Sequence, residues 1–475
     1  MARAGARARA GGEATRIEKD TLGEMPVPAS ALYGAQTARA VQNFPISGLR
    51  AHPAFVDATV RIKLAAARVN ARLGLLPAKK ARAIEAAARE VLAGRWRDQF
   101  VVDAYQAGAG TSHNMNVNEV LANRATELLG GRRGAERLVD PNDDVNMAQS
   151  TNDVVPTAIR LAALDLAPAV VDALSALAET LERKAEAWKD VVKSGRTHLM
   201  DATPLTLGQE VSGWAAAIAA AARRVRDALP ELSVLGIGGT AVGTGLNAHP
   251  RYRALVVKEL EKLTGVPFTP APNLFYAMQS LAPVVALSAA LRSAALELLR
   301  ISGDVRLLGS GPNTGLAELR LPPVQPGSSI MPGKVNPSMA EMLAMVSYQI
   351  VGLDSAIAWA ASGGQLELNV MMPLVAWDLC HALEIAAAAV RAFDERCARG
   401  LEADAARCRH FAERTVSLAT ALAPRIGYAR AAEIVKESVR SRKSIVEVAS
   451  TQGGLTPGEA RRILDARKLT RPGRA

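Results

Sequence analysis

The stretch GSSIMPGKVNP concentrates several residue types that could act on a bound molecule. Ser328 and Ser329 follow a glycine, so the backbone can bend close to a ligand there. Lys334 can neutralise a carboxylate as a point charge, and Asn336 offers amide donors. Two glycines and two prolines within the stretch predict a loop. We therefore expect a loop that holds an anionic group.

Two further polar stretches stand where helices are expected to begin. GAGTSHNMNVNE contains Thr111 beside glycines, and QSTND contains Ser150, Thr151 and Asn152 in succession. Backbone N–H groups and hydroxyls at a helix N-terminus suit a carboxylate or a phosphate. The same residue types also cap helices routinely, so ordinary capping is the alternative for both stretches.

The stretch GRTHLMDATPLTLGQE adds Thr197 and His198. A histidine among polar neighbours can transfer or steer a proton, although an isolated histidine more often has a structural role. Glu341, about two helical turns beyond Lys334, could pair with a histidine from elsewhere. The combined donors favour a small dianion and the stabilisation of extra negative charge. Proton abstraction next to a carboxylate is the chemistry that we expect.

Patterns typical of cofactor binding are weak in this sequence. GIGGTA (236–241) matches the G-x-G-x-x-A pattern of dinucleotide sites, but no β-branched strand precedes it and no acidic residue follows in a suitable context. We interpret it as a turn-rich connection. The polar stretches contain no metal-ligand cluster and no phosphate loop. We therefore expect neither a bound cofactor nor a metal site.

Long helices must position these polar stretches. Apolar residues make up 49% of the chain and aromatic residues only 4%, so alanine and leucine dominate, which favours helices over sheets. Apolar periodicity predicts helices near 54–94, 158–190, 206–229, 278–308, 339–363 and 375–398. The segments after residue 158 would be rods of about 33–50 Å that pack side by side. Apolar faces wider than one stripe indicate contacts with other subunits.

The same pattern predicts how the chain is divided. We expect an all-α protein with a disordered tail (1–14), an N-terminal domain (15–150), a central helix bundle (151–398) and a small C-terminal helical domain (399–475). The arginine-rich start resembles a transit peptide only in composition, because it lacks serine and amphipathic spacing.

Charge and cysteine content limit the possible partners and the compartment. The formal net charge is +11, but the basic residues are scattered and few aromatics could stack on bases, so we expect no nucleic acid partner. Cys380, Cys397 and Cys408 lack metal-ligand spacing, which indicates reduced thiols and a cytoplasmic location. No apolar run reaches the ~18–20 residues of a membrane span, so no membrane association is expected.

Five segments, in the same order, resemble the signatures of the fumarase/aspartase superfamily. They are GAGTSHNMNVNEVLANRA, PNDDVNMAQSTNDVVPT, GRTHLMDATPLTLGQE, GGTAVGTGLN and GSSIMPGKVNP. The resemblance extends over residues 15–471. It implies a three-domain all-α fold whose central helices form a twenty-helix bundle in a homotetramer, with each active site shared between three subunits. It also implies a small dicarboxylate substrate and anti elimination that yields fumarate.

The resemblance implies a role for each candidate residue. Ser328 would be the general base that removes the C3 proton of the substrate. The resulting aci-carboxylate would be bound by Thr111, Ser150, Thr151 and Ser329. Lys334 and Asn336 would bind the other carboxylate. Asn152, Thr197 and His198 would meet the leaving group or that carboxylate, with Glu341 orienting His198.

Smaller differences decide which lyase we expect. The chain has GAGTS where fumarases typically have GSGTQ, and Asp140 where they often have a histidine at a secondary dicarboxylate site. YGAQTARAVQNFPISG, AMQS, AQSTND, GGQLELNV and LTRPG also resemble aspartases. We therefore expect an L-aspartate ammonia-lyase of amino-acid metabolism.

Two other functions are kept as alternatives. A class II fumarate hydratase is the first alternative. A lyase acting on another substituted succinate stands beside it, because His113 and Asn313 depart from the family pattern. A structural, non-catalytic relative is the second. The presence of Ser328, Lys334 and His198 argues against that second alternative.

Overall fold

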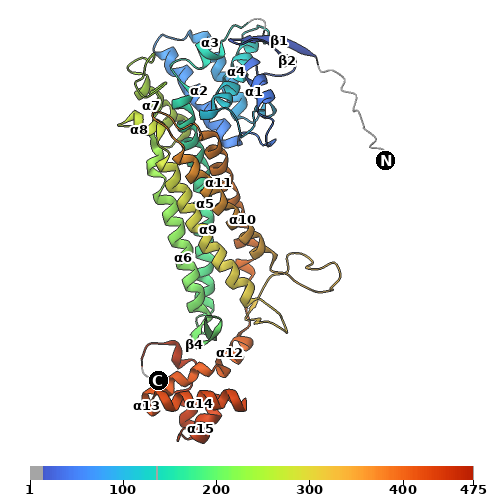
Figure 1. Ribbon diagram of the computed structural model, residues 1–475, viewed down its shortest axis with the longest axis vertical. Helices are drawn as coiled ribbons and strands as arrows, with labels where there is room; N and C mark the ends of the chain where they lie inside the picture. The colour runs from blue at the N-terminus through green and yellow to red at the C-terminus, as the bar shows by residue number, and fades with distance from the viewer. Residues whose placement is uncertain (1–13, 135–136, 474–475) are drawn as a thin grey trace. The chain divides into compact units, whose positions relative to one another are not determined.

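The computed structural model describes residues 14–134 and 137–473 and is predominantly helical (Figure 1). The all-α prediction is confirmed, and the strands are few and short. Apart from residue 14, the predicted tail lies outside the described residues. The described chain groups by its contacts into two compact units. The three-domain boundaries stay a prediction.

Unit 1 consists of the described residues up to Ala169, together with Arg224–Arg292 and Ile350–Ile385. Its shorter elements are β1 (Thr15–Asp20), β2 (Gly23–Pro28), α1 (Ala35–Asn43), α2 (Pro53–Arg72), α3 (Ala78–Leu92), α4 (Thr111–Leu128), β5 (Val234–Leu235), α7 (Tyr252–Thr264), β6 (Thr269–Pro270) and α8 (Leu274–Gln279). Helix α2 packs against α3 and α7, and α3 packs against α4. Leu64, Ile84 and Leu121 are buried in the core that these helices share.

Unit 2 consists of Val170–Arg223, Ser293–Gln349 and the described residues from Ala386 onward. Its shorter elements are β3 (Val192–Thr197), β4 (Met200–Thr206), β7 (Leu319–Arg320), β8 (Glu402–Ala403), α12 (Ala405–Arg414), α13 (Ala423–Ile426), α14 (Tyr428–Ser441), α15 (Ile445–Gln452) and α16 (Pro457–Ile463). Capping boxes at Ser444 and Thr456 start α15 and α16. Leu418, Ile434, Val448 and related residues form a separate small core.

Five long helices occur where the apolar periodicity predicted helices, and each contains residues of both units. They are α5 (Thr151–Ala187), α6 (Leu207–Asp227), α9 (Ala282–Leu308), α10 (Ser338–Ser362) and α11 (Met372–Arg396). Most predicted boundaries agree within a few residues. Helix α5 starts earlier than predicted, because the polar residues from Thr151 onward form its first turn instead of preceding it.

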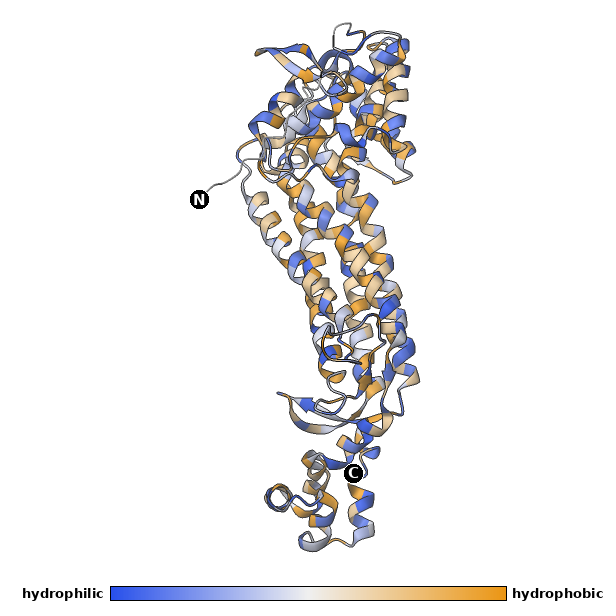
Figure 2. Cartoon of the chain, turned by 90° about the vertical axis from the view of Figure 1, so that its right-hand side faces the viewer, coloured by the Kyte–Doolittle hydropathy of each residue, from blue (hydrophilic) through white to orange (hydrophobic). Residues whose placement is uncertain are grey.

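Within the described residues, four segments are long and apolar enough to cross a membrane, judged by length and composition alone. They are Thr151–Ala187, Ala282–Leu308, Ser338–Ser362 and Met372–Gly400. The prediction that no segment would be long enough was wrong on this measure, because single charges in alanine-rich helices leave the average hydropathy high. Figure 2 shows apolar residues over much of these helices. The most apolar window of α10 is only 39% buried.

The β3–β4 hairpin was not predicted from the sequence. The two strands pair antiparallel with a bulge between Ser194 and Gly195, and α12 packs against β3. Glycine and proline within these short strands weaken the strand pattern that the sequence offers. The hairpin carries the GRTHLMDA residues at its tip, so it matters for the candidate site.

Candidate active site

Thr111 is the first residue of α4 and is exposed. The turn before it has two residues with positive φ, Ala109 (62°) and Gly110 (89°). The Ala109 N–H donates to the Val370 carbonyl at 2.8 Å, and a Cβ on Gly108 would approach that of Val370 to 2.9 Å. Close packing against Val370 therefore fixes the turn and presents the hydroxyl of Thr111 at the start of the helix.

Thr151 and Asn152 are the first two residues of α5, Ser150 directly precedes them, and the fully buried Asp153 follows in the same turn. The Asp153 carboxylate accepts the Ser150 N–H on Oδ1 at 2.9 Å. Its Oδ2 accepts the N–H groups of Gly238 at 2.9 Å and Thr240 at 3.0 Å. Burial raises the pKa of Asp153 to about 6, although these backbone donors and the charge of Lys63 oppose the shift.

Asp153 thereby joins the GIGGTA stretch to the start of α5. Asn152 strengthens the same connection, since its Nδ2 donates to the Ala241 carbonyl at 2.8 Å. Two backbone N–H groups of the stretch are thus used by a side chain of the chain itself. The interpretation of GIGGTA as a turn-rich connection agrees with this geometry. We call Thr111, Ser150, Thr151 and Asn152 the unit-1 half-site.

Thr197 and His198 lie at the tip of the β3–β4 hairpin and are exposed. The two turn residues, His198 and Leu199, have φ values of 56° and 61°. Two-residue hairpin turns of this kind normally use Asn and Gly, because positive φ is costly for other residues. A strained turn that presents a histidine to solvent favours a functional role for His198.

Buried charges hold the base of this hairpin. Lys193 of β3 contacts Glu210 at 2.9 Å and Glu318 at 3.3 Å, and Arg196 contacts Glu318 at 2.9 Å. Lys193 and Glu318 are almost completely inaccessible to solvent. Because buried charges need partners, this cluster fixes β3, whereas the tip two residues beyond it remains exposed.

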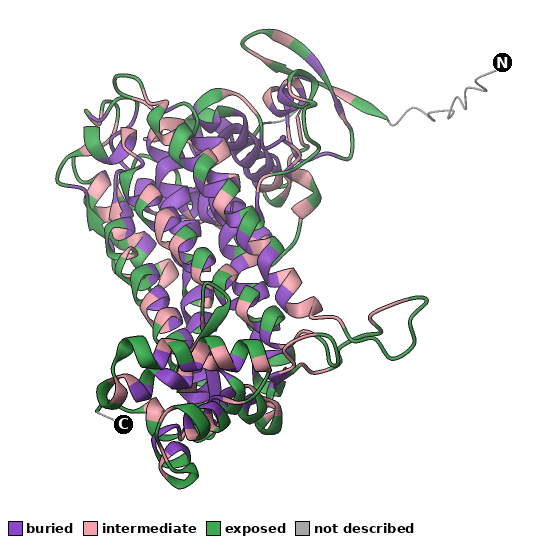
Figure 3. Cartoon of the chain, turned by 60° about the horizontal axis from the view of Figure 1, so that its bottom comes forward, coloured by how far each residue is buried: buried purple, intermediate pink, exposed green. Residues whose placement is uncertain are grey.

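The GSSIMPGKVNP stretch forms a loop between α9 and α10, as predicted, in a segment that is largely exposed (Figure 3). The Ser328 Oγ accepts the N–H groups of Ile330 at 3.2 Å and Met331 at 3.0 Å. The Gly327 N–H donates to the Lys334 carbonyl at 2.9 Å, and a Cβ on Gly327 would lie 2.3 Å from that oxygen. Only glycine fits there, so Gly327 closes the loop.

The predicted carboxylate ligands of this loop differ in their surroundings. Asn336 donates from Nδ2 to the Gly327 carbonyl at 2.6 Å, so part of its hydrogen-bonding capacity stabilises the loop. Ser329 and Lys334 are exposed, and their side chains form no hydrogen bond or ion pair with the described residues. Glu341 is in the first turn of α10 and makes no contact of that kind with His198.

The structure therefore groups the predicted residues by unit. Ser150, Thr151 and Asn152 are linked by hydrogen bonds to one another or to their supporting residues in unit 1, and Thr111 starts α4 in the same unit. The other candidates occupy the hairpin tip, the loop and α10 within unit 2. The sequence interpretation missed four residues whose hydrogen bonds lead to the start of α5. They are Lys63, Asn114, Asn146 and Asp153. A single lysine between apolar Ile62 and Leu64 was the available signal for Lys63.

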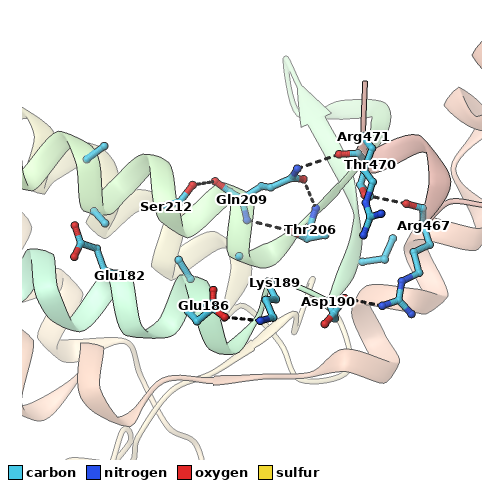
Figure 4. Close-up of a pocket in the computed structure, with 15 residues that line it drawn as sticks. Glu182, Glu186, Lys189, Asp190, Thr206, Gln209, Ser212, Arg467, Thr470 and Arg471 are labelled. Carbon is cyan, nitrogen blue, oxygen red and sulfur yellow. Dashed lines mark hydrogen bonds and ion pairs between the residues drawn. The ribbon is translucent and has the colours of Figure 1, made fainter. Parts of the chain in front are cut away.

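None of the predicted site residues lines the pocket of about 530 Å³ shown in Figure 4. It lies within unit 2, and its charged residues are largely paired with one another. Asp190 contacts Arg467 at 2.6 Å, and Glu186 contacts Lys189. Across residues 14–134 and 137–473, no group of three histidine, cysteine or acidic side chains is arranged to hold a metal ion.

Comparison with known protein families decides the classification. Residues 23–352 match the family described as Lyase, and residues 418–471 match the family described as Fumarase C C-terminus. The chain belongs to the fumarate lyase superfamily. This agrees with the resemblance that the five sequence segments indicated.

Individual relatives narrow the comparison. A protein of Ralstonia nicotianae named fumarate hydratase class II is 49% identical over 93% of this chain and 96% of its own length. The solved class II fumarase of Schistosoma mansoni has a TM-score of 0.93 and 38% identity, covering 96% of this chain and 99% of its own. A Brucella melitensis structure described as fumarate lyase:delta crystallin has a TM-score of 0.91 and 45% identity, covering 97% and 100%.

These relatives overturn the prediction of an L-aspartate ammonia-lyase and of a role in amino-acid metabolism. The first relatives, 44–49% identical to this chain, are all named class II fumarate hydratase. Two of the features behind the wrong prediction, Asp140 and the YGAQT segment, have structural roles. Asp140 accepts the N–H groups of Asn142 at 2.8 Å and Asp143 at 3.0 Å, as a helix cap does.

The YGAQT segment has a structural role as well. Buried Glu119 of α4 accepts the N–H groups of Gly34 at 2.9 Å, Gln36 at 3.0 Å and Thr37 at 3.1 Å, and so anchors the start of α1. A residue that caps a helix or anchors a turn need not report on the leaving group. This is the physical reason that YGAQT and Asp140 misdirected the choice of substrate.

Proposed function

We propose that the protein is a class II fumarate hydratase that adds water to fumarate reversibly to give L-malate. The observation that carries the proposal is the similarity to proteins of that name over nearly the whole of both chains. The presence of Ser328, Lys334 and His198 supports an active enzyme over a non-catalytic relative.

In the malate-to-fumarate direction, Ser328 would take the C3 proton as an alkoxide. Forming an alkoxide at neutral pH is unfavourable, but hydrogen bonds to the charged form lower that cost. The two N–H groups that already point at Ser328 Oγ, those of Ile330 and Met331, are suited to this. The loop geometry therefore supports Ser328 as the general base.

The electrons of the broken C–H bond would pass into the adjacent carboxylate and then return to form the C2–C3 double bond, while the C2 hydroxyl would take a proton from His198 and leave as water. Neutral donors at the start of α4 and α5 are suited to the aci-carboxylate, since they meet a helix N-terminus. Exposed Lys334 is suited to the second carboxylate. His198 and Thr197 would contact the departing hydroxyl.

We further propose a homotetramer in which neighbouring subunits complete the active site. Met345, Tyr348 and Trp359 of α10 are 62–78% exposed, which supports a subunit contact on that helix. The exposure of His198, Lys334 and Ser329 supports partners from another copy. Three free, buried cysteines support a cytoplasmic location.

A substrate panel tests the function. With L-malate, the purified protein should generate the ultraviolet absorbance of fumarate, and with fumarate that absorbance should decline. The same preparation should release no ammonia from L-aspartate. Inactivity on malate and fumarate in both directions, with an intact oligomer, would refute the proposal. Light scattering coupled to size exclusion tests the tetramer in the same preparation.

A further inference from the structure

Lys63 is a buried lysine in α2 that the expected mechanism does not use. It is completely inaccessible to solvent, and its Nζ donates to the Asn146 Oδ1 at 2.8 Å. Among the described residues, Lys63 forms no ion pair. A buried charge without a direct counter-ion is costly, so its retention calls for a compensating interaction.

A short series of hydrogen bonds leads from Lys63 to the unit-1 half-site. The Asn146 Oδ1 that accepts from Lys63 also accepts from the Asn114 Nδ2 at 3.3 Å. The same Asn114 Nδ2 lies 3.3 Å from the Thr151 Oγ1. Asn146 in turn donates to the Gln149 carbonyl at 3.2 Å, next to Ser150. The hydrogen bonds thus connect Lys63 to the Thr151 hydroxyl and to the backbone of the residue before Ser150.

The charged and titratable groups around Lys63 come from several helices. Burial lowers the pKa of Lys63 to about 7, and the charge of Asp153 on α5 opposes this shift. His113 of α4 has its pKa lowered to about 3 by burial and by Lys63, so it is neutral near pH 7. Asp153 also faces Tyr252 of α7, whose pKa is raised by burial first and by Asp153 second.

The unit-1 half-site itself carries no charge, since its four side chains are hydroxyls and an amide. We propose that Lys63 is a positioning residue that supplies the positive charge for this half-site and orients Thr151 through Asn146 and Asn114. A bound dianion would favour the protonated form of Lys63. The proposal rests on the proposed function only for its kinetic test, because dicarboxylate binding can be measured without turnover.

The first test is Lys63→Met, which keeps the side-chain volume and removes the charge. We expect succinate, an unreactive dicarboxylate, to bind about tenfold or more weakly by calorimetry, with a similar fall in kcat/KM. Thermal stability should be equal to or higher than that of the native protein, because an apolar residue no longer has to bury a charge. Native-like succinate affinity would overturn the proposal.

The pH dependence separates a charge effect from a packing effect. Lys63 is protonated below its pKa of about 7, so the charge, and with it succinate affinity, should decline as pH rises above that value. The Lys63→Met variant should lack this decline. A decline of the same size in that variant would assign the titration to another group and contradict the proposal.

Asn146→Asp provides a second, nearly isosteric variant if Lys63→Met fails to fold. The new carboxylate would pair with Lys63, neutralise its field and raise its pKa. We expect weaker succinate binding and an alkaline decline displaced to higher pH. Unchanged affinity together with an unchanged profile would overturn the role of this hydrogen-bond series.

Lys184→Met is the matched control. Lys184 also donates to a neutral oxygen, the Leu401 carbonyl at 2.7 Å, and burial lowers its pKa. It lies on α5, 33 residues beyond Thr151 and in unit 2. We expect native succinate affinity and activity. If the native protein binds succinate in a Lys63-dependent way yet does not hydrate fumarate, the proposed function fails while the role of Lys63 stands.

Discussion

The two groups of candidate residues differ in how the surrounding chain holds them. In the unit-1 half-site, Asp153 and Asn114 fix the first turn of α5 through buried and partly buried hydrogen bonds. In unit 2, His198, Ser329 and Lys334 project from a hairpin tip and a loop with few contacts. Donors that must stabilise developing charge benefit from being fixed in advance, whereas segments that admit and release substrate need low local stability. We therefore expect the first group to act in binding, and the second group to include the residue that transfers the proton as well as further binding residues.

The largest expected effect is on turnover, from a change in the unit-2 loop that contains Ser328. Ser328→Ala removes the proposed base, so we expect kcat to fall by about a thousandfold or more. Stability should stay within about 0.5 kcal/mol of the native value, because the side chain is half-buried in an irregular loop. The formation of fumarate from malate measures kcat, and urea unfolding measures the stability.

Ser329→Ala is the control for that experiment. It removes a neighbouring hydroxyl that forms no hydrogen bond with the described residues, and it is expected to weaken substrate binding more than kcat. Near-native turnover in Ser328→Ala would show that another residue is the base. The expectation that the unit-2 loop carries out the proton transfer would then be wrong.

The next largest effect is on stability in the buried group. Asp153→Ala leaves the N–H groups of Ser150, Gly238 and Thr240 without their acceptor, so we expect a loss of about 2–4 kcal/mol in the free energy of unfolding. Urea titrations at one fixed protein concentration measure it, because an oligomer's stability depends on concentration.

Asp143→Ala is the matched control, since Asp143 is an exposed carboxylate ten residues earlier in the chain. It should change stability by no more than about 0.5 kcal/mol. Equal losses of stability in Asp153→Ala and Asp143→Ala would show that Asp153 does not fix the unit-1 half-site. The two groups of candidate residues would then not differ in how firmly the chain holds them.

Much of the fold followed from the sequence because long helices repeat one apolar pattern over many residues. Helices α6, α9, α10 and α11 lie close to their predicted ranges for this reason. The β3–β4 hairpin did not follow, since its pairing depends on the buried contacts of Lys193 and Glu318 across distant segments. A contact between residues so far apart in the chain cannot be predicted from the local sequence pattern.

The candidate site divides in a similar way. Residues in glycine-rich or polar stretches, such as Thr111, Ser150 and Ser328, stand out because their composition differs from the surrounding helices. Lys63 and Asn146 do not stand out, because their importance arises from a hydrogen bond that only the packed α2 helix creates. The leaving group was predicted wrongly because Asp140 and the YGAQT segment form hydrogen bonds that hold the backbone, and such bonds do not depend on the substrate.

The smallest effect concerns the strain at the hairpin tip. Leu199 has a φ of 61° and is 72% exposed, so Leu199→Gly should stabilise the protein by about 0.5–1 kcal/mol in urea unfolding. Leu22, in the β1–β2 turn, is 80% exposed but has no positive φ, so Leu22→Gly should instead destabilise by about 0.5–1 kcal/mol. Because the two leucines are similarly exposed, opposite changes in stability for the two substitutions would be due to the difference in backbone φ and not to the loss of the side chain. If Leu199→Gly destabilises the assembled protein as Leu22→Gly does, the Leu199 side chain is covered by another subunit, and the exposed group is completed by assembly instead of remaining open to solvent.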